Sequence, residues 1–452
     1  MADELVQADR AHLIHPLHSV ATHDSLGPLV LVRGQGVLVY DSAGREYVDG
    51  LSSLWNVNVG HGRAELGQAA AEQMSKLAFA SAYVGMTNEP AVRLAERLAS
   101  LAYPKLNTVF FASGGAEANE SAFKLVRSYW KIKGKPGKVK IIARRFGYHG
   151  VTIAAMSATG IPAYWPLFEP RAPGFLHVAP PYCYRCELGK TPGNCAIDCA
   201  DDLEAAILRE GPETVAAFIA EPVQGAGGVI PPPAEYFPRV REVCDRHGVL
   251  FIADEVITGF GRTGRWFALD HWGVQPDVMS FAKGVTSAYI PLGGIIMSDE
   301  IADTIRSLPP DQAWMHAYTY SGHPTSCAVG LANLDIIERE GLVPRAAEMG
   351  KRLIDGLRTL EALPAVGEVR GLGLMAAVEL VADKATRASY PASARVGTRV
   401  LKAAAERGVL LRVRGDVVML APPLVISAEQ VDRVVDTVGA AIRAVTGSAV
   451  GQ

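Results

Sequence analysis

Short apolar runs of strand length alternate with helical patterns through the middle of the chain. Five of these runs are apolar throughout or nearly so, as is typical of strands buried on both faces of a sheet. They lie at residues 108–112, 139–143, 215–220, 249–253 and 278–282. The alternation favours an α/β fold in which helices cover a mostly parallel sheet.

Polar or reactive residues follow every one of these runs. Ligands of open α/β sheets bind outside the carboxyl ends of the strands, so we expect these residues to form one site. In chain order they are Ser113-Gly114-Gly115, Tyr148-His149-Gly150, Glu221-Pro222, Asp254-Glu255 and Lys283-Gly284.

The pattern changes toward both ends of the chain. Residues 1–35 are mixed and are expected to form an arm, and residues 36–40 and 46–48 are expected to form two strands around a turn. Beyond residue 330, helical patterns at 331–338, 346–360 and 391–407 accompany a strand at 371–380 and a hairpin at 410–420. We predict an N-terminal arm with part of a small α+β domain (1–60), a large domain that carries the site (61–329) and a C-terminal small domain (330–452).

Composition narrows the function classes. The chain has 452 residues, which favours two domains, and a formal net charge of -3, which gives no reason to expect nucleic acid or an anionic membrane as partner. There is no apolar run long enough to span a bilayer and no secretory signal pattern, so we expect a cytoplasmic protein.

Lys283 and Asp254 are the strongest candidates for chemistry. A Lys at the end of a buried strand is partly desolvated, which lowers its pKa and favours a neutral amine able to form a Schiff base. A buried carboxylate such as Asp254 needs a cationic partner, and a protonated pyridine nitrogen supplies one. The alternatives are a surface Lys and a helix-capping Asp.

A glycine-rich turn at Gly114-Gly115-Ala116 lies between a predicted strand and a predicted helix. Glycines before a helix expose backbone N–H groups that suit a phosphate. The G-x-G-x-x-G pattern of dinucleotide folds is absent from this turn, which disfavours a nicotinamide dehydrogenase. Tyr148 could stack on a cofactor ring or be an ordinary half-buried Tyr.

Four cysteines lie close together in an insertion-like segment. Cys183, Cys186, Cys195 and Cys199 have the spacing C-x2-C-x8-C-x3-C, which is compact enough for a tetrahedral structural zinc. Free cysteines in a tight loop are the alternative, and we favour it slightly. No catalytic metal is expected.

Taken together, these motifs resemble the class III aminotransferases of fold type I, in the ω-amino acid:pyruvate or amine:pyruvate group. The resemblance runs from about Gly36 to about Ile426. It rests on the segments Asp254-Glu-Val256, Thr258-Gly-Phe-Gly-Arg262, Lys283-Gly284, Glu221-Pro-Val-Gln224, Tyr148-His-Gly150 and Thr319-Tyr-Ser-Gly-His-Pro324.

The resemblance implies a seven-stranded, mostly parallel sheet in the large domain, pyridoxal 5'-phosphate as cofactor and a homodimer with shared active sites, with a tetramer left open. It also implies roles for individual residues. Lys283 would be the Schiff-base lysine and proton shuttle, and Asp254 would be the partner of the pyridine nitrogen. Val256 and Tyr148 would contact the two faces of the ring, with His149 and Glu221 as further neighbours of the ring. The phosphate would be bound by a cup formed by Gly114, Gly115 and Ala116 and by Thr319 from the neighbouring subunit.

Substrate positions follow from the same resemblance. Trp55 is similar to an aromatic residue at the substrate entrance, and Arg412 to a mobile Arg that pairs with a substrate carboxylate. Arg414 lies two residues away on the same face of a predicted strand, so the assignment could belong to either. Ala116 stands where many relatives carry Ser, which puts cofactor affinity in doubt but not cofactor identity.

The activity implied is ping-pong transfer of an amino group from an ω-amino acid or primary amine to pyruvate or a similar keto acid, with (S) preference. An aminomutase, lyase or decarboxylating enzyme on the same fold is one rival, and an inactive homologue is another. The sequence leaves the natural amine donor open.

Overall fold

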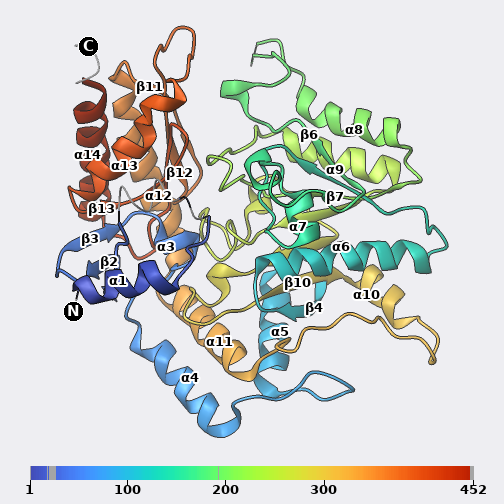
Figure 1. The fold of residues 1–452 in the computed structure, drawn as a ribbon. Coiled ribbons are helices and arrows are strands. Elements are labelled where there is room, and N and C mark those ends of the chain that lie inside the picture. Colours follow the sequence, from blue (N-terminus) through green and yellow to red (C-terminus); the bar gives the residue numbers. More distant parts are fainter. Residues whose placement is uncertain (1, 18, 20–26, 192, 448–452) are drawn as a thin grey trace.

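A seven-stranded sheet forms the centre of the larger part of the molecule (Figure 1). The computed structural model describes residues 2–17, 19, 27–191 and 193–447. The strand order is β4-β10-β9-β8-β7-β5-β6, and β10 alone runs antiparallel to its neighbours. The strands are β4 (Leu106–Ala112), β5 (Lys140–Arg144), β6 (Phe175–Val178), β7 (Val215–Ala220), β8 (Leu250–Asp254), β9 (Val278–Phe281) and β10 (Gly293–Ser298). The predicted α/β class and mostly parallel sheet are confirmed, and each of the five apolar runs overlaps one of these strands.

Both faces of this sheet are buried, because successive residues along a strand point to opposite faces. One face contributes to a core that includes helix α6, and the other contributes to the largest core. The first set includes Ile141, Ile219, Ile252 and Ile295, and the second includes Ile142, Phe218, Phe251 and Ile296. The edge-side strand β4 differs from the prediction, since three of its seven residues are only partly buried and one is exposed.

Thirteen α-helices are present in the described part of the chain. α6 begins at Gly115, directly behind the sheet edge that carries the predicted site residues. The helices are α1 (Ala2–His12), α3 (Ser52–Trp55), α4 (Ala64–Leu77), α5 (Glu89–Leu101), α6 (Gly115–Ile132), α7 (Ile153–Ala158), α8 (Asp198–Glu210), α9 (Tyr236–His247), α10 (Asp299–Arg306), α11 (Pro324–Arg339), α12 (Leu342–Arg358), α13 (Val396–Ala405) and α14 (Ala428–Thr446). The domain boundary predicted at 329/330 lies inside α11, so this helix joins the two parts.

The smaller part of the molecule combines both ends of the chain, as expected. Parallel pairing of β13 with β3 joins the N-terminal strands to the C-terminal segment, and Figure 1 shows the blue and red segments side by side. Its two sheets have the orders β1-β2-β3-β13 and β11-β12-β15-β14. These strands are β1 (Leu31–Gln35), β2 (Leu38–Asp41), β3 (Glu46–Asp49), β11 (Val366–Gly371), β12 (Ala376–Leu380), β13 (Val409–Leu410), β14 (Arg412–Arg414) and β15 (Val417–Leu420).

Two predicted elements of this part were wrong in their bounds. The strand expected at 371–380 is the end of β11, a turn and the whole of β12. The helix expected at 391–407 starts only at Val396, because Arg395 has a φ of 46° and interrupts the helical backbone after a short 3-10 turn. The predicted hairpin around Gly415 is confirmed by the pairing of β14 with β15.

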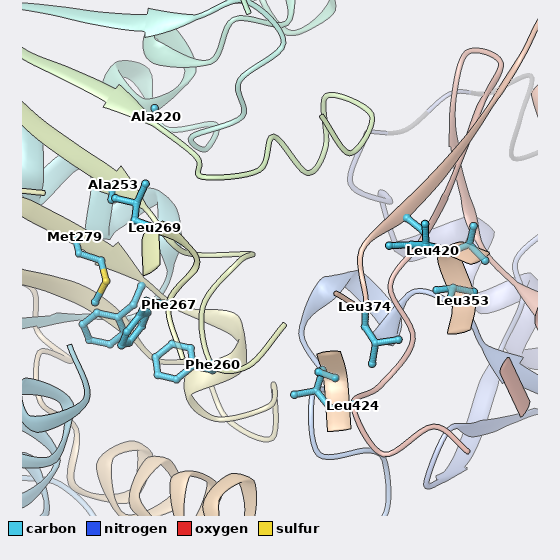
Figure 2. Close-up of a cluster of buried hydrophobic side chains, with 14 of the residues drawn as sticks. Ala220, Ala253, Phe260, Phe267, Leu269, Met279, Leu353, Leu374, Leu420 and Leu424 are labelled. Carbon is cyan, nitrogen blue, oxygen red and sulfur yellow. The ribbon is translucent and has the colours of Figure 1, made fainter. Parts of the chain in front are cut away.

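One apolar core extends from the large sheet into the smaller part. Figure 2 shows Phe260, Phe267 and Met279 from the large part, and Leu374 and Leu424 from the C-terminal part, within this cluster of buried side chains. Burial of apolar surface on this scale is the main stabilising contribution to a fold. Its continuity holds the two parts together around the predicted site.

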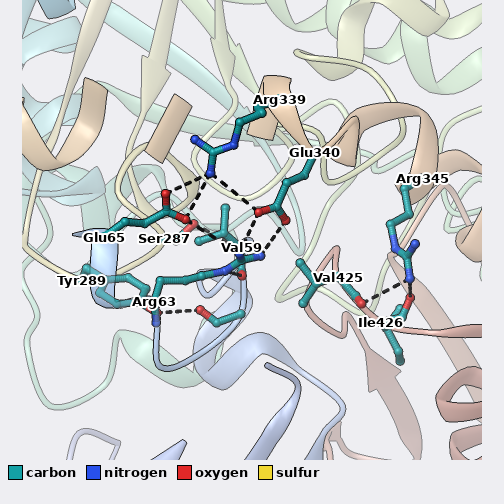
Figure 3. A network of polar contacts seen from close by, with 11 residues as sticks. Val59, Arg63, Glu65, Ser287, Tyr289, Arg339, Glu340, Arg345, Val425 and Ile426 are labelled. Atoms are coloured by element: carbon teal, nitrogen blue, oxygen red, sulfur yellow. Dashed lines mark hydrogen bonds and ion pairs between the residues drawn. The ribbon is translucent and has the colours of Figure 1, made fainter. Parts of the chain in front are cut away.

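A polar network fixes the loop that follows Lys283 (Figure 3). The backbone N–H of Arg63 donates to the Tyr289 hydroxyl at 2.7 Å, and Tyr289 donates to the Gly60 carbonyl at 2.8 Å. The Arg63 guanidinium makes a two-bond contact with the Glu340 carboxylate, with both bonds at 2.7 Å.

In the described ranges no helix has the length and apolar character needed to cross a membrane.

Candidate active site

A cavity of about 340 Å³ lies at the carboxyl ends of the central strands. It receives residues from the segments after β4, β5, β7, β8 and β9, so the predicted convergence on one sheet edge is observed. Its walls contain eleven of the residues that the sequence singled out, namely Ser113, Gly114, Gly115, Ala116, Tyr148, His149, Gly150, Glu221, Asp254, Val256 and Lys283.

Asp254 is the last residue of β8 and is 3% exposed. Its Oδ2 accepts hydrogen bonds from Asn119 Nδ2 at 2.8 Å and from His149 Nδ1 at 2.7 Å, and its Oδ1 accepts from the Val256 backbone N–H at 3.1 Å. Burial alone would raise the pKa of Asp254, but these bonds outweigh burial and leave the pKa lowered. The carboxylate is therefore ionised at neutral pH and faces the cavity with a negative charge.

Asn119 holds both members of this pair. Its amide group donates to Asp254 and also to the backbone carbonyl of His149 at 2.8 Å, which uses both amide hydrogens. Since His149 donates through Nδ1, its Nε2 is the acceptor nitrogen, and it has no hydrogen-bond partner among the described residues. The network fixes the direction in which Asp254 presents its charge.

Lys283 is separated from the end of β9 by Ala282 and has a φ of 47°, a conformation that costs a residue other than Gly about 1–3 kcal/mol. Strain of this kind persists where the surrounding structure holds it, and it is concentrated at functional sites. Burial lowers the pKa of the Lys283 amine, and the positive charge of Arg412 acts in the same direction, while Asp254 and Glu221 oppose it. The net effect favours a neutral, nucleophilic amine at the cavity wall.

The N-terminus of α6 forms a cup of backbone N–H groups. Gly114 caps the helix in an extended conformation without a side-chain hydrogen bond, so the first N–H groups of the helix are available to an anion. A Cβ added to Gly115 would lie 2.9 Å from the Val256 side chain, and one added to Gly150 would lie 2.7 Å from the Ala116 Cβ. The cup is therefore packed too closely for larger residues at the two glycine positions.

These three features fit pyridoxal phosphate. The cup suits its phosphate, the ionised Asp254 suits its pyridine nitrogen, and the Lys283 amine suits its aldehyde. All three line one cavity, and Val256 and Tyr148 lie on its walls as apolar and aromatic surfaces for a ring.

Glu221 and Tyr148 complete the cavity on the side of β7. The Glu221 carboxylate accepts backbone N–H bonds from Tyr148 at 2.9 Å and Gly225 at 2.8 Å, and burial raises its pKa. The Tyr148 ring lies 5.6 Å from the Tyr164 ring, at an interplanar angle of 52°. Tyr164 was not predicted, and it extends the aromatic surface toward β14.

The structure separates the roles of the two arginines of β14. Arg414 donates to the Gly227 carbonyl at 2.9 Å and lies 4.5 Å above the Phe146 ring, so its guanidinium is occupied. Arg412 interacts electrostatically with Tyr148, Tyr164 and Lys283, and across the described ranges its guanidinium has no recorded hydrogen bond or ion pair. Of the two, Arg412 has the guanidinium that is free to bind a ligand, and its positive charge acts on Lys283.

Three predicted residues, Trp55, Thr319 and Arg412, are not in the cavity wall formed by the described chain. Trp55 is 2% exposed and packs in an apolar cluster with Val223 and Met419, whereas its neighbour Asn56 lines the cavity. Thr319 is exposed on the surface of the chain. Contact of Trp55 with substrate and contact of Thr319 with a neighbouring phosphate stay predictions.

The four clustered cysteines are all free thiols. Burial, with the nearby Cys183 and Cys195 as further causes, raises the pKa of Cys199 to about 12. Within the described residues, no group of three or more His, Cys, Asp or Glu side chains has an arrangement that could hold a metal ion. The zinc hypothesis therefore has no geometric support in this structure.

Several lining residues were missed by sequence reasoning. Asn119 stands four residues after Gly115 and so lies one helical turn deeper in α6, a position that the glycine-rich motif could have indicated. The others come from short loops without a distinguishing pattern, and these are Asn56, Ile257, Thr286, Ala288, Ile290 and Leu292.

Comparison with known proteins shows the family to which the chain belongs. The family model described as aminotransferase class III matches residues 19–442. A diaminobutyrate–2-oxoglutarate transaminase of Halomonas elongata is 41% identical over 98% of this chain and 96% of its own length. A putrescine–pyruvate aminotransferase of Pseudomonas aeruginosa is 41% identical over 94% of this chain and 93% of its own length.

Solved structures give the same result. An (S)-enantioselective omega-transaminase of Thermomicrobium roseum is 50% identical with a TM-score of 0.95, covering 98% of this chain and 99% of that one. An omega transaminase of Pseudomonas jessenii in complex with PMP is 41% identical with a TM-score of 0.94, covering 98% of both chains.

The fold and the site define a pyridoxal-phosphate enzyme of fold type I. More narrowly, the chain belongs to the class III aminotransferases, enzymes that transfer an amino group from an amine to a keto acid.

Proposed function

We propose that this transaminase takes its amino group from a primary amine or an ω-amino acid and gives it to pyruvate or a similar keto acid with one carboxylate. The observation that supports this proposal best is the free guanidinium of Arg412, whose positive charge acts on the Lys283 amine. It is one cation, suited to one carboxylate. Arg414, the nearest alternative, is already bound to the Gly227 carbonyl.

The relatives differ in their acceptors, and their names include both 2-oxoglutarate and pyruvate. A dicarboxylate acceptor would need a second cation near the cavity. The other Arg of β14, Arg414, donates to the Gly227 carbonyl and lies over the Phe146 ring, so its guanidinium is not available as that second cation. A monocarboxylate acceptor is therefore the better match to this chain.

Bound pyridoxal phosphate supplies an aldehyde for amine exchange and a conjugated ring that takes up negative charge. The residues of the chain orient the cofactor and transfer the protons. The α6 cup and Asp254 orient the ring, and Asp254 keeps positive charge on its nitrogen. Lys283, with its lowered pKa, removes the proton from the donor carbon that bears nitrogen and returns a proton later in the cycle, so one amine serves as base and acid.

The proposal is tested by incubating the holoenzyme with β-alanine or a primary amine together with pyruvate, and by measuring both products. We expect alanine to accumulate in equal amount with the carbonyl product of the donor. Conversion of the amine without consumption of pyruvate would instead indicate an aminomutase, lyase or decarboxylating enzyme. No conversion with a panel of donors and keto acids would indicate an inactive homologue.

Arg412→Ala should remove selectivity for carboxylate-bearing donors. In the donor half-reaction, kcat/KM for β-alanine should fall about 10- to 100-fold, the range expected for losing hydrogen bonds to a charged group. The value for a primary amine without a carboxylate should change little. Arg414→Ala is the matched control, because its guanidinium is occupied elsewhere; a selectivity loss in that variant and not in Arg412→Ala would reverse the assignment.

Arg412 should also influence how the rate of the donor half-reaction depends on pH. Its positive charge helps to lower the pKa of Lys283, so Arg412→Gln raises this pKa and reduces the neutral fraction of the amine at a given pH. With a donor that lacks a carboxylate, the acidic limb of the donor half-reaction should move to higher pH. Arg412→Lys keeps the charge and should leave the limb in place. A limb that moves equally in both variants would contradict this electrostatic role.

We further propose a homodimer with shared active sites and a preference for (S)-amines. Large apolar side chains are exposed in the segment that carries Thr319, namely Met315 at 87% and Tyr320 at 60%, which supports a covered interface there. The (S) preference is supported by the similarity of this chain to the (S)-enantioselective omega-transaminase of Thermomicrobium roseum. A cytoplasmic location stays a prediction.

A further inference from the structure

The connection between α10 and α11, drawn in gold in Figure 1, carries Thr319 at the end of an alternating segment. Residues 314, 316 and 318 are half-buried, whereas residues 315, 317 and 319 are exposed. Alternation of this kind means that an extended chain packs one side on the protein and presents the other side outward. Thr319 belongs to the outward set.

The buried side of this segment is bound to a single face of α6. Residues 117, 121 and 128 of the helix are four and seven apart and so lie on one side of it. The segment runs along this side toward the helix N-terminus, which carries the phosphate cup. The contacts are Trp314 Nε1 to Ser128 Oγ at 3.2 Å, His316 Nε2 to Ser121 Oγ at 2.8 Å, and Tyr318 hydroxyl to Glu117 carbonyl at 3.2 Å.

His316 is the central contact, and its neighbours determine its protonation. The Ser121 hydroxyl donates to the Glu117 carbonyl at 2.7 Å, so it accepts from His316 Nε2–H, and His316 Nδ1 accepts from Lys124 Nζ at 2.8 Å. Burial, with Lys124 as a second cause, lowers the pKa of His316 to about 4. The neutral ring stacks on Phe110 of β4, with centroids 5.2 Å apart and an interplanar angle of 27°.

We propose that His316 is a positioning residue for the active site of the neighbouring subunit, because it holds the segment that presents Thr319 to that subunit's phosphate cup. The inference rests on the proposed homodimer with shared sites. In this arrangement α6 serves two active sites. Its N-terminus forms the phosphate cup of its own subunit, and its outer face fixes the segment that presents Thr319 to the neighbouring subunit. Loss of the His316 contacts should therefore weaken cofactor binding in the partner and not in the chain that carries the change.

Mixed dimers separate these two effects. Two differently tagged full-length chains are co-expressed and purified on both tags. One chain carries Lys283→Ala, so that the absorption band of lysine-linked cofactor comes from the other chain alone. In the trans arrangement, His316→Ala is placed on the Lys283→Ala chain. In the cis arrangement, His316→Ala is placed on the reporting chain. The apparent Kd for pyridoxal phosphate is measured from the band in each case.

We expect the apparent Kd to rise about 10-fold in trans, as for loss of one hydrogen bond to a charged group, and to stay near that of the unaltered mixed dimer in cis. Equal changes in both arrangements, a change in cis alone or no change in either would overturn the inference. His316→Asn serves as the second variant if His316→Ala does not yield dimers, with the same outcomes. Thr319→Ala in trans tests the shared site itself. If this variant leaves the apparent Kd unchanged, the proposal of a homodimer with shared sites fails, and the inference fails with it. If Thr319→Ala raises the apparent Kd and His316→Ala does not, the inference alone is refuted.

Discussion

Lys283→Ala should abolish transamination, with kcat reduced by at least about 10⁴-fold, because one amine provides both nucleophilic and acid–base catalysis. The cup of α6 and the carboxylate of Asp254 do not depend on this side chain, so the variant should still retain cofactor without a covalent link. Turnover is measured as alanine formed from pyruvate, and retained cofactor is measured after gel filtration and denaturation.

Lys138→Met provides a matched control for the loss of a buried lysine. Lys138 is 4% exposed, donates to the Val215 and Gly248 carbonyls and has a pKa lowered by burial to about 8, but it lies outside the cavity. Its replacement should leave kcat within a few-fold of the original enzyme. A Lys283→Ala enzyme that turned over at a comparable rate would refute the scheme.

Asp254→Asn should lower kcat about 10³-fold while the chain remains folded, since it removes a charge and preserves shape. The amide oxygen can still accept hydrogen bonds from Asn119 and His149, so the loss reports the missing negative charge opposite the pyridine nitrogen. The measurements are kcat for the amine and pyruvate pair and the free energy of unfolding of the variant.

Asp277→Asn is the control for removing a buried carboxylate from the same sheet. Asp277 is 5% exposed and pairs with Lys105 and Arg241, away from the cavity. This variant should lose stability, because two cations lose their partner, but it should keep its kcat. If Asp254→Asn lost stability without losing kcat, the carboxylate would be a structural group instead.

The parallel core of the fold could be predicted from the sequence because its strands are buried on both faces. Runs such as residues 215–220 are apolar at every position. Few structures other than a strand buried on both faces require an apolar residue at every position of so short a run. The strand β10 begins with Gly293 and Gly294, and β6 has only four residues at the sheet edge, so neither gave a clear strand pattern. The late start of α13 follows from the backbone of Arg395, and local residue preference does not specify it.

The chemistry of the site was predictable where a strand end delivers a reactive group, as with Lys283 and Asp254. The supporting groups were harder to predict, because they act through contacts that only the fold creates. The hydrogen bond between Asn119 and Asp254 joins two residues that are 135 positions apart in the chain. Arg412 and Arg414 are equivalent in sequence pattern, and only the contact of Arg414 with Gly227 distinguishes them.

The central claim is that Lys283 and Asp254 hold pyridoxal phosphate for amino-group transfer, and an absorption spectrum of the purified protein tests it most directly. We predict a band near the visible edge that moves to the near ultraviolet when β-alanine or another amine donor is added and returns when pyruvate is added. A protein that shows no such band, even after incubation with pyridoxal phosphate, would contradict the claim.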